Sequence, residues 1–407
     1  MPLRLLTNHI ALSVYMARNT TLQICQFGFV RKMYMNYIML KDICAINMGQ
    51  SPDSNSYNDE GYGLPFFQGN ADFGERYPIA KKWCSAPQKI AKPEDILISV
   101  RAPIGAVNYA KEKCCIGRGL AAITLDKSKV SKEFIFWLLK SKNQELNNKG
   151  VGSTFKSIGR KVLEETLVPD LTKEKQMRYS EILEKLYFII QSRMIQQKEL
   201  DELVKARFIE VFGESDKNTK QFPVRKLNEI SSYWNGLTYK PVDTVEDGNG
   251  TLVLRSSNIQ NGVLAFDDNV YVSCDIKEKL LVQDNDILMC SRNGSAALVG
   301  KTALIKGLVE PTTFGAFMMI IRSEYYSYLK TYFEMPFFRS QISTGTSTIN
   351  QITGKMLNEI SLPVPDIGTV KVFEEFVNRI AKSKAVIEKS LKELETLQAS
   401  LMQKYFS

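Results

Sequence analysis

The sequence predicts an α+β protein in which two tandem mixed α/β domains are separated and closed by two long helices packed as an antiparallel coiled-coil pair. Three observations predict this class. The chain repeats itself once, with a period of about 190 residues. Each repeat opens with short β-branched and aromatic runs broken by clusters of Gly, Asn and Pro. Each repeat then closes with a long segment that contains neither Gly nor Pro.

Residues 1–32 are expected to form an N-terminal extension with little order. An apolar stretch at 10–17 follows Arg4, as in a secretion signal, but Arg18 ends it and no small-residue cleavage site follows. An ordinary domain opening begins only at 37–43. After the extension, we expect a first mixed domain, a central helical spacer, a second mixed domain and a distal helical spacer, at residues 33–171, 172–213, 214–365 and 366–407.

The relation between the two mixed domains is clearest at the tripeptide Asp-Ile-Leu. It stands at 95–97 and again at 286–288, an offset of 191 residues, and is followed in the two copies by Arg101 and Arg292. Agreement of both the tripeptide and the later arginine at one offset indicates a duplicated unit.

Further matches flank this pair. Leu-Lys-Asp-Ile at 40–43 matches Leu-Asn-Glu-Ile at 227–230, and Asn70, after Phe-Phe-Gln-Gly, matches Asn258, after Leu-Arg-Ser-Ser. Near the end of the first copy, six residues agree with the second copy at a constant offset of 194, namely Ser153, Thr154, Ile158, Lys161, Leu163 and Pro169.

Two long helices are expected at 172–212 and 369–406, each after a Pro-marked extended stretch. Apolar residues recur there at spacings of three and four, at Leu183, Leu186, Ile190, Met194, Leu200, Val204 and Phe208, and at Ile380, Ile387, Leu391, Leu394 and Leu401. One apolar stripe per helix needs a partner, so each helix is expected to pack against the other. Polar residues interrupt the seam and either set its register or mark where the helices diverge, namely Gln197, Lys384 and Gln398.

Composition excludes several classes of protein. With 44% hydrophobic and 24% charged residues, the chain has the composition of a globular protein and not of a disordered one. No apolar run reaches the roughly 18 residues that a membrane-spanning helix needs, so no membrane association is expected. The seven cysteines include no CxxC pair, which argues against a zinc site or a disulfide framework and favours a cytoplasmic location.

A net charge of +9 suggests a nucleic-acid partner, but the charge is unevenly distributed. Residues 1–32 contain four basic and no acidic side chains, whereas residues 214–365 contain 15 basic and 16 acidic ones. Bulk charge alone therefore does not establish DNA binding. His9 is the single histidine, which removes imidazole catalysis and His-ligated metals from the expected functions.

The closing part of each repeat resembles the specificity subunits of type I restriction-modification systems, and the resemblance covers residues 37–407. Each mixed domain ends in a Ser/Thr-rich turn, at 152–155 and at 345–349, followed by a Leu-rich stretch, a Pro-containing strand and a long helix. The strand reads Leu-Val-Pro-Asp-Leu in the first copy and Leu-Pro-Val-Pro in the second. The first helix starts with Glu-Lys-Gln at 174–176; the second departs from the family pattern, with Val-Lys at 370–371.

The resemblance implies a sequence-specific DNA-binding specificity subunit without catalytic residues, metal or cofactor. Each mixed domain would be a target recognition domain that reads one half of a bipartite target in double-stranded DNA. The helical pair would hold the two domains a fixed distance apart and scaffold two methyltransferase (modification) subunits, with restriction/translocase subunits joining in the full complex.

Seven side chains are candidates for DNA contact: Arg101, Arg118, Lys156, Arg255, Asn258, Arg292 and Asn293. Arginine can bond guanine O6 and N7 together, and asparagine can pair with adenine N6 and N7, so these residue types suit base reading. Each could instead be a phosphate contact or a solvated surface residue. The repetition of Arg101 and Arg292 would also be explained by a role in stabilising the fold.

Motifs for catalysis are not found. Residues 294–302 approach a phosphate-binding loop, but the first glycine stands one residue too far from Gly300, and no Asn-Pro-Pro-aromatic sequence is present for adenine methylation. Two other functions remain open at this point. The chain could be the DNA-recognition part of a split type II restriction-modification enzyme, or a coiled-coil interaction protein without a nucleic-acid role.

Overall fold

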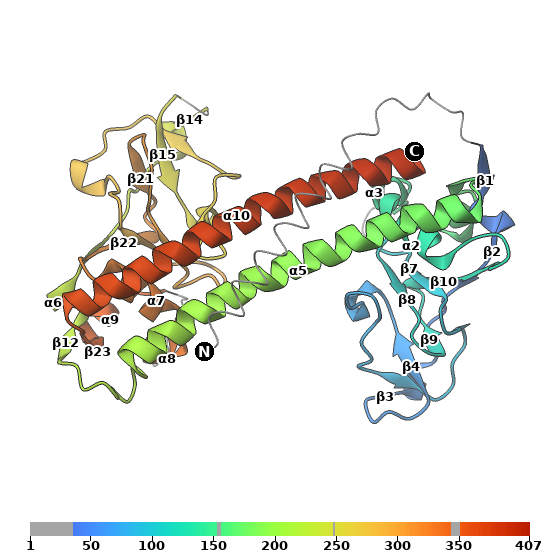
Figure 1. The fold of residues 1–407 in the computed structure, drawn as a ribbon, viewed down its shortest axis with the longest axis horizontal. Helices are drawn as coiled ribbons and strands as arrows, with labels where there is room; N and C mark the ends of the chain where they lie inside the picture. Colours follow the sequence, from blue (N-terminus) through green and yellow to red (C-terminus); the bar gives the residue numbers. More distant parts are fainter. Residues whose placement is uncertain (1–35, 153–155, 247–248, 343–350) are drawn as a thin grey trace. The chain divides into compact units, whose positions relative to one another are not determined.

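The computed structural model describes residues 36–152, 156–246, 249–342 and 351–407 (Figure 1). The predicted extension at 1–32 lies outside the described residues, as do most of both Ser/Thr-rich turns. The chain divides into two compact units, unit 1 with residues 1–188 and 395–407, and unit 2 with residues 189–394. Each long helix therefore contributes to both units.

Unit 1 contains three sheets. A four-stranded antiparallel sheet has the order β2 (Cys44–Met48), β10 (Leu120–Leu125), β7 (Ile96–Ser99) and β8 (Val107–Tyr109). A five-stranded sheet has the order β3 (Tyr57–Asn58), β5 (Trp83–Cys84), β4 (Leu64–Phe67), β9 (Cys114–Ile116) and β6 (Ile90–Ala91), in which β4 and β9 are parallel. A two-stranded sheet pairs β1 (Tyr37–Met39) with β11 (Leu167–Pro169).

Unit 2 contains four sheets. One antiparallel sheet has the order β13 (Ser232–Asn235), β22 (Met318–Arg322), β19 (Ile287–Cys290) and β20 (Thr302–Leu304). A mixed sheet has the order β14 (Thr244–Val245), β18 (Tyr271–Val272), β15 (Thr251–Leu254) and β21 (Thr312–Phe314). Two short sheets pair β16 (Ile259–Gln260) with β17 (Val263–Leu264), and β12 (Val224–Lys226) with β23 (Ser361–Pro363).

Short helices cover the four-stranded sheets. Those of unit 1 are α2 (Lys132–Ser141), α3 (Asn143–Asn148) and α4 (Arg160–Glu164). Those of unit 2 are α6 (Leu227–Ile230), α7 (Tyr326–Glu334), α8 (Pro336–Ile342) and α9 (Gly354–Glu359). In α2 six consecutive apolar residues are buried, so this helix is enclosed on all sides by the core of unit 1.

The duplicated tripeptide has the same structural role in both units. Asp95 and Asp286 are buried, and each accepts a hydrogen bond of 2.8 Å from the backbone N–H three residues earlier. The residue before each aspartate has a positive φ, 70° at Glu94 and 71° at Asn285. The aspartate carboxylate therefore closes the tight turn that leads into β7 and β19.

The two long helices are α5 (Lys173–Phe212) and α10 (Ile367–Phe406). The sequence predicted starts at Thr172 and Thr369, so α10 begins two residues earlier than expected. The reason is Asp366, whose carboxylate accepts hydrogen bonds from the N–H of Thr369 at 2.9 Å and from its hydroxyl at 2.7 Å. An aspartate N-cap thus replaces the acidic-Gln start that the second copy lacks.

The first copy uses its glutamine differently. The Gln176 side chain is buried, accepts a hydrogen bond from the backbone N–H of Ser131 at 2.9 Å and donates one to the carbonyl of Leu171 at 2.8 Å. Ser131 is also the N-cap of α2 and accepts from the N–H of Phe134. Gln176 therefore ties the start of α5 to the start of α2.

Contacts between the long helices occur inside each unit. In unit 1 the rings of Tyr179 on α5 and Tyr405 on α10 stack at 3.9 Å between centroids. In unit 2 Lys384 on α10 forms an ion pair of 2.5 Å with Asp201 on α5, and Phe208 packs edge-on against Phe373 at 5.8 Å. The polar Lys384 of the predicted seam is thus paired.

The predicted stripe of α5 differs from the observed packing at one position. Leu183, Leu186, Ile190 and Phe208 are buried, but Met194 is half-exposed, at 51%. Phe188 and Ile195 are also exposed, on the face of the helix opposite the buried residues. The helix consequently has apolar side chains on two faces, which a single-stripe interpretation does not anticipate.

A half-buried arginine, Arg76, fastens a loop of the first mixed domain to α5. The Arg76 guanidinium forms an ion pair of 2.5 Å with Glu184 and lies over the rings of Phe136 and Tyr187, at 4.6 and 4.3 Å from the centroids. The Tyr187 hydroxyl donates to Glu75 at 2.6 Å, and burial together with this bond raises the pKa of Tyr187 to about 12. Charge-assisted and cation–π contacts at one point fix the loop on the helix.

Candidate nucleic-acid interface

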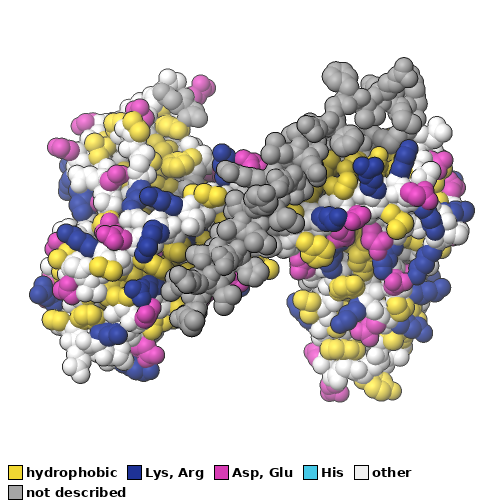
Figure 2. Space-filling view, in the orientation of Figure 1, with side chains coloured by type: hydrophobic (Ala, Val, Ile, Leu, Met, Phe, Trp, Pro, Cys, Tyr) yellow, Lys and Arg dark blue, Asp and Glu magenta, His cyan; other side chains and the backbone are white. Residues whose placement is uncertain are grey.

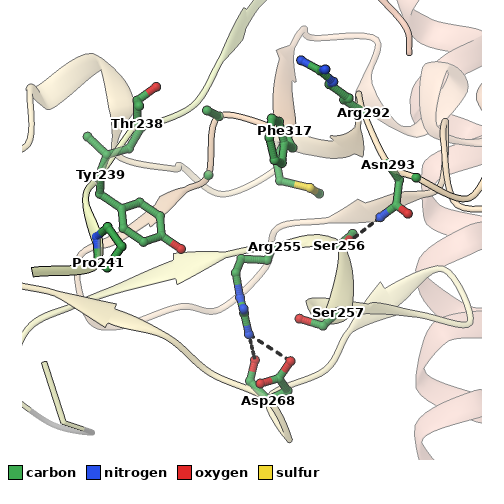
Figure 3. Close-up of a pocket in the computed structure, with 15 residues that line it drawn as sticks. Thr238, Tyr239, Pro241, Arg255, Ser256, Ser257, Asp268, Arg292, Asn293 and Phe317 are labelled. Carbon is green, nitrogen blue, oxygen red and sulfur yellow. Dashed lines mark hydrogen bonds and ion pairs between the residues drawn. The ribbon is translucent and has the colours of Figure 1, made fainter. Parts of the chain in front are cut away.

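Unit 2 contains an open cleft of about 950 Å³ (Figure 3). Five chain segments meet there: the residues after β13, the end of β15 with the 3₁₀ turn Ser256–Asn258, the connection before β18 at Asp268, the turn after β19 and the turn before β22. Three of the seven predicted contact residues line it, namely Arg255, Arg292 and Asn293. They are far apart in sequence and are brought together by the two sheets.

Arg255 follows the last residue of β15. Its Nη2 forms an ion pair of 2.9 Å with Oδ2 of Asp268 and donates to the Asp268 carbonyl at 3.2 Å. Its Nε is buried and has no hydrogen-bond partner among the described residues. Asp268 thus orients the guanidinium at the cleft.

Arg292 and Phe317 form one side of the cleft. The backbone N–H of Arg292 donates to the carbonyl of Phe317 at 3.1 Å, and its guanidinium lies over the Phe317 ring, 5.4 Å from the centroid. Both side chains are exposed, Phe317 at 61%. An exposed aromatic ring under a cation presents both an apolar face and hydrogen-bond donors.

Asn293 is held in the turn after β19. Its Nδ2 donates to Oγ of Ser256 at 3.2 Å, and its Oδ1 accepts from the N–H of Ser295 at 3.0 Å. Figure 3 shows Asn293 directed toward Ser256 and Arg255 directed toward Asp268. The neighbouring Cys290 thiol has a raised pKa because it is buried, so it stays protonated below the cleft.

Asn258 does not line the cleft, and the prediction of a base contact for it is corrected. The residue is completely buried, and its Nδ2 donates to the Ala265 carbonyl at 2.9 Å and to Oδ1 of Asn269 at 3.2 Å. Its Oδ1 accepts from the N–H of Arg255 at 2.9 Å. An amide engaged in this way cannot also pair with a base. Asn258 instead shapes the turn that presents Arg255.

The match of Asn70 with Asn258 is also wrong. In unit 2, β15 pairs in parallel with β21, and in unit 1, β4 pairs in parallel with β9. The residue after the first strand of each pair is Arg255 in unit 2 and Gln68 in unit 1, so these two residues are equivalent. In unit 1 the N–H of Gln68 is bonded by Asp72, at 2.9 Å. Asp72 is therefore the functional counterpart of Asn258, and the sequence match was shifted because the turn of unit 1 is one residue longer.

The candidate residues of unit 1 lie on adjoining backbone segments. The N–H of Val100, before Arg101, donates to the carbonyl of Gly119, after Arg118, at 2.9 Å. The N–H of Ala102 donates to the carbonyl of Lys156 at 3.1 Å. Arg101, Arg118 and Lys156 are all exposed. The fold thus gathers three basic residues at the edge where β7 ends and β10 begins.

Arg101 and Arg292 have equivalent backbone environments. Arg101 forms an antiparallel bridge with Ser157, and Arg292 forms one with Gln351, the residue 194 positions after Ser157. The residue after each bridge partner donates its N–H to the carbonyl before the arginine, at 2.9 Å in unit 1 and 2.7 Å in unit 2. The duplicated arginines therefore occupy one place in a duplicated frame.

A family model described as the type I restriction modification DNA specificity domain matches residues 35–202. Residues 35–202 thus match the specificity domain of type I restriction-modification systems. The family resemblance found in the sequence is thereby confirmed, and the segment includes Arg101, Arg118 and Lys156 together with most of α5.

Curated proteins of this specificity family match part of their length. The putative type I restriction enzyme MjaX specificity subunit of Methanocaldococcus jannaschii is 44% identical over 162 residues, which are 40% of this chain and 37% of that protein. The EcoKI specificity subunit of Escherichia coli is 27% identical over 161 residues, 37% of this chain and 34% of that protein. The chain thus matches about a third of the length of these relatives.

Solved structures extend the likeness of the fold. The type I S subunit from M. genitalium has a TM-score of 0.56 at 16% identity and covers 94% of this chain and 98% of its own. A structure described for assembly and conformational transition of the type I R-M system has a TM-score of 0.57 at 16% identity, over 93% of this chain and 99% of its own. This chain therefore has the mixed α+β fold of type I specificity subunits.

Several cleft residues were not anticipated from the sequence. Asp268 and Tyr239 come from connections between strands, and their proximity to Arg255 depends on sheet packing. Phe317 could have been found from the sequence. Gly-Ala-Phe at 315–317 stands directly before β22, just as Gly-Arg-Gly at 117–119 stands directly before β10. Aligning these two tripeptides would have placed Phe317 beside Arg292.

The described residues contain neither a membrane-spanning helix nor a cluster of metal-binding side chains. Within 36–152, 156–246, 249–342 and 351–407, no helix combines the length and apolar character needed to span a membrane. The same stretches of chain contain no group of three or more His, Cys, Asp and Glu side chains arranged to hold a metal ion. In the view of Figure 2, basic and acidic side chains alternate over each unit, so charge is not concentrated in one uniform patch on that face.

Proposed function

We propose that this chain is the specificity subunit of a type I restriction-modification complex and that it binds double-stranded DNA sequence-specifically. The observation that supports this most is the cleft of unit 2, where Arg255, Arg292 and Asn293 surround an open space of about 950 Å³. The match of residues 35–202 to the type I DNA specificity domain supports the same role for unit 1.

The chemistry of these side chains suits base reading. A guanidinium offers paired donors to guanine O6 and N7, and an asparagine amide matches adenine N6 and N7. Asp268 holds Arg255 in one orientation, which lowers the entropy lost on binding. Phe317 adds an apolar surface that suits a thymine methyl group or a sugar.

The target would be bipartite. Residues 33–171 and 214–365 would act as two target recognition domains, each for one half-site, with residues 172–213 and 366–407 as helical spacers. The conserved backbone frame around Arg101 and Arg292 supports two binding surfaces of one design.

The spacers would form an antiparallel coiled-coil pair. Tyr179 meets Tyr405 in unit 1 and Asp201 meets Lys384 in unit 2. Tyr179 and Asp201 are 22 residues apart on α5. Their partners Tyr405 and Lys384 are 21 residues apart on α10, as a continuous antiparallel register requires. A helix of 40 residues is about 60 Å long, enough to separate two half-sites on DNA.

Methyltransferase subunits would dock on the exposed apolar side chains of α5. Phe188, Ile195, Leu203 and Ile209 recur at near-sevenfold spacing on one face of the helix and are exposed by 41% to 65%. Solvent-exposed apolar side chains in such a row indicate a protein interface. Two such subunits, with restriction/translocase subunits in the complete assembly, would perform the chemistry in the cytoplasm, and this chain itself would not be an enzyme.

DNA binding by the purified chain tests the proposal. Retention of a random duplex library should enrich a split sequence, and the affinity should fall steeply with salt. With S-adenosylmethionine alone the chain should not methylate DNA, and adding the methyltransferase subunit should produce methylation at the enriched sequence. Enrichment of no sequence would leave the coiled-coil interaction protein as the better account. Turnover by the chain alone would support a split type II enzyme.

A further inference from the structure

The two units have the same backbone frame around the binding surface but different side chains on it. The residue after the parallel strand is Arg255 in unit 2 and Gln68 in unit 1. The N–H of Gly315 and that of Gly117 each donate to the carbonyl that ends this strand, at 2.9 and 2.8 Å. Because the frames agree to this extent, side chains can be compared position by position.

Most positions on the surface differ between the units. The differing pairs are Arg255 and Gln68, Asn293 and Ala102, Ala316 and Arg118, and Phe317 and Gly119. One position is the same in both, Arg292 in unit 2 and Arg101 in unit 1, and it has the same bridge to the chain that follows.

We infer that the differing positions set the base preference of each half-site, foremost Arg255 opposite Gln68, whereas Arg101 and Arg292 supply binding that does not depend on sequence. The inference rests on the proposed function. A side chain present in both domains does not account for a difference between two half-sequences, and a phosphate contact is a role that needs no such difference. A side chain that differs at one place in an equivalent frame can distinguish them.

The contacts of Arg255 and Gln68 indicate which bases they would read. Asp268 orients the partly exposed guanidinium of Arg255 at the cleft, and a guanidinium held in one orientation favours guanine. Gln68 is exposed, and its Nε2 donates to Oγ of Ser51 at 2.9 Å, which fixes the amide. A glutamine amide pairs with adenine N6 and N7. Unit 2 should therefore require a guanine where unit 1 requires an adenine.

Exchange of these two residues is sterically reasonable, whereas a Gly119→Phe exchange is not. A Cβ on Gly119 would lie 2.4 Å from the Gln68 carbonyl oxygen, so unit 1 cannot accept the aromatic ring that unit 2 has at Phe317. Gln68 is exposed and Arg255 is partly exposed, so each side chain has room for the other.

The test uses the full-length chain and a library of randomised DNA duplexes, with sequencing of the retained molecules. Arg255→Gln should change one required guanine to adenine in one half-site and leave the other half-site and the gap unchanged. Gln68→Arg should make the reverse change in the other half-site. Arg292→Ala should weaken retention of all sequences by about fivefold or more without altering any preferred base.

Arg225→Gln is the matched control, because it removes the same charge from the exposed strand β12, outside the cleft. It should leave the preferred sequence unchanged. If the wild-type chain enriches a split sequence but both exchange variants enrich the identical sequence, the inference is overturned. A changed base in Arg292→Ala would overturn it as well. A wild-type chain that enriches no sequence contradicts the proposed function instead. Should Arg255→Gln fail to fold, Gln68→Arg in the other unit decides the matter.

Discussion

At the scale of single residues, Asn258 illustrates how a polar side chain can serve the binding surface without touching the ligand. Its amide joins three backbone or side-chain groups of one loop, and Arg255 begins that loop. The loop that buries Asn258 folds back through residues 265–269. No sequence pattern predicts that the loop folds back over Asn258. The prediction that Asn258 contacts adenine therefore rested on the residue type alone.

Asn258→Ala should destabilise unit 2 by about 2 to 4 kcal/mol, because it leaves buried groups of the loop without partners. Urea unfolding followed by circular dichroism measures the change. Asn235→Ala, at an exposed position of β13, is the control and should cost less than about 0.5 kcal/mol. A small effect at both positions would show that the buried amide is dispensable and would reopen its role in base reading.

Arg101 and Arg292 were predicted more securely, for a physical reason. Asp95 and Asp286 align the two repeats and mark the turn before β7 and β19. Because the length of each strand is then known, the position of the arginine that follows it can be predicted. What the sequence could not decide is whether such an arginine contacts bases or phosphates, since this depends on side-chain surroundings such as the Phe317 ring.

At the scale of elements, the long helices were predicted to within one or two residues because Gly, Pro and apolar spacing mark them clearly. The start of α10 was placed too late because the cap of Asp366 was not recognised. The exposed apolar face of α5 was not predicted. The spacing of apolar residues along the sequence shows that a side chain is apolar, but it does not show which neighbour that side chain packs against.

Gln176→Ala should destabilise unit 1 by about 1 to 3 kcal/mol. The substitution removes the acceptor for the N–H of Ser131 and the donor to Leu171, so the starts of α2 and α5 would no longer be linked. Thermal or urea unfolding measures the loss, with Lys175→Ala, which changes an exposed neighbour on the same helix, as control. Equal stability of the two variants would mean that water replaces both bonds at no cost.

At the scale of the whole molecule, the proposed spacer can be lengthened to change the DNA target. A position near Glu210 is unsuitable for an insertion, because Phe208 and Phe212 on either side both pack against Tyr328 and Phe373. An insertion at that point would disrupt the core of unit 2.

Matched insertions of four residues, after Gln196 in α5 and after Glu388 in α10, keep the register and lengthen both helices by about 6 Å. Since DNA rises about 3.4 Å per base pair, the variant should prefer a gap longer by one or two base pairs and keep both half-sequences. Methylation mapping with the partner subunits compares it with wild type. Altered half-sequences at an unchanged gap would contradict a spacing role.

Removal of Tyr405, Phe406 and Ser407 should destabilise unit 1, although most of this unit lies more than 200 residues earlier in the chain. Tyr405 and Phe406 are buried in its core, where Phe406 packs against Phe134 at 5.4 Å. Loss of two buried aromatic side chains costs about 3 kcal/mol or more. Limited proteolysis of unit 1 should accelerate in the truncated chain and not in Lys404→Ala, whose side chain is exposed.

The same shared core has a consequence for synthesis on the ribosome. Residues up to Phe188 emerge early, yet their apolar surface is completed only by residues 395–407. At about 5 to 20 residues per second, the first half of the protein waits roughly 10 to 40 seconds for its missing helix. An mRNA truncated between the two repeats would yield a fragment that lacks residues 395–407. The apolar core of this fragment would be incomplete and accessible to proteases. If the proposed function holds, degradation of such fragments would remove single domains that bind half a target, because the first domain becomes stable only after residues 395–407 have been made.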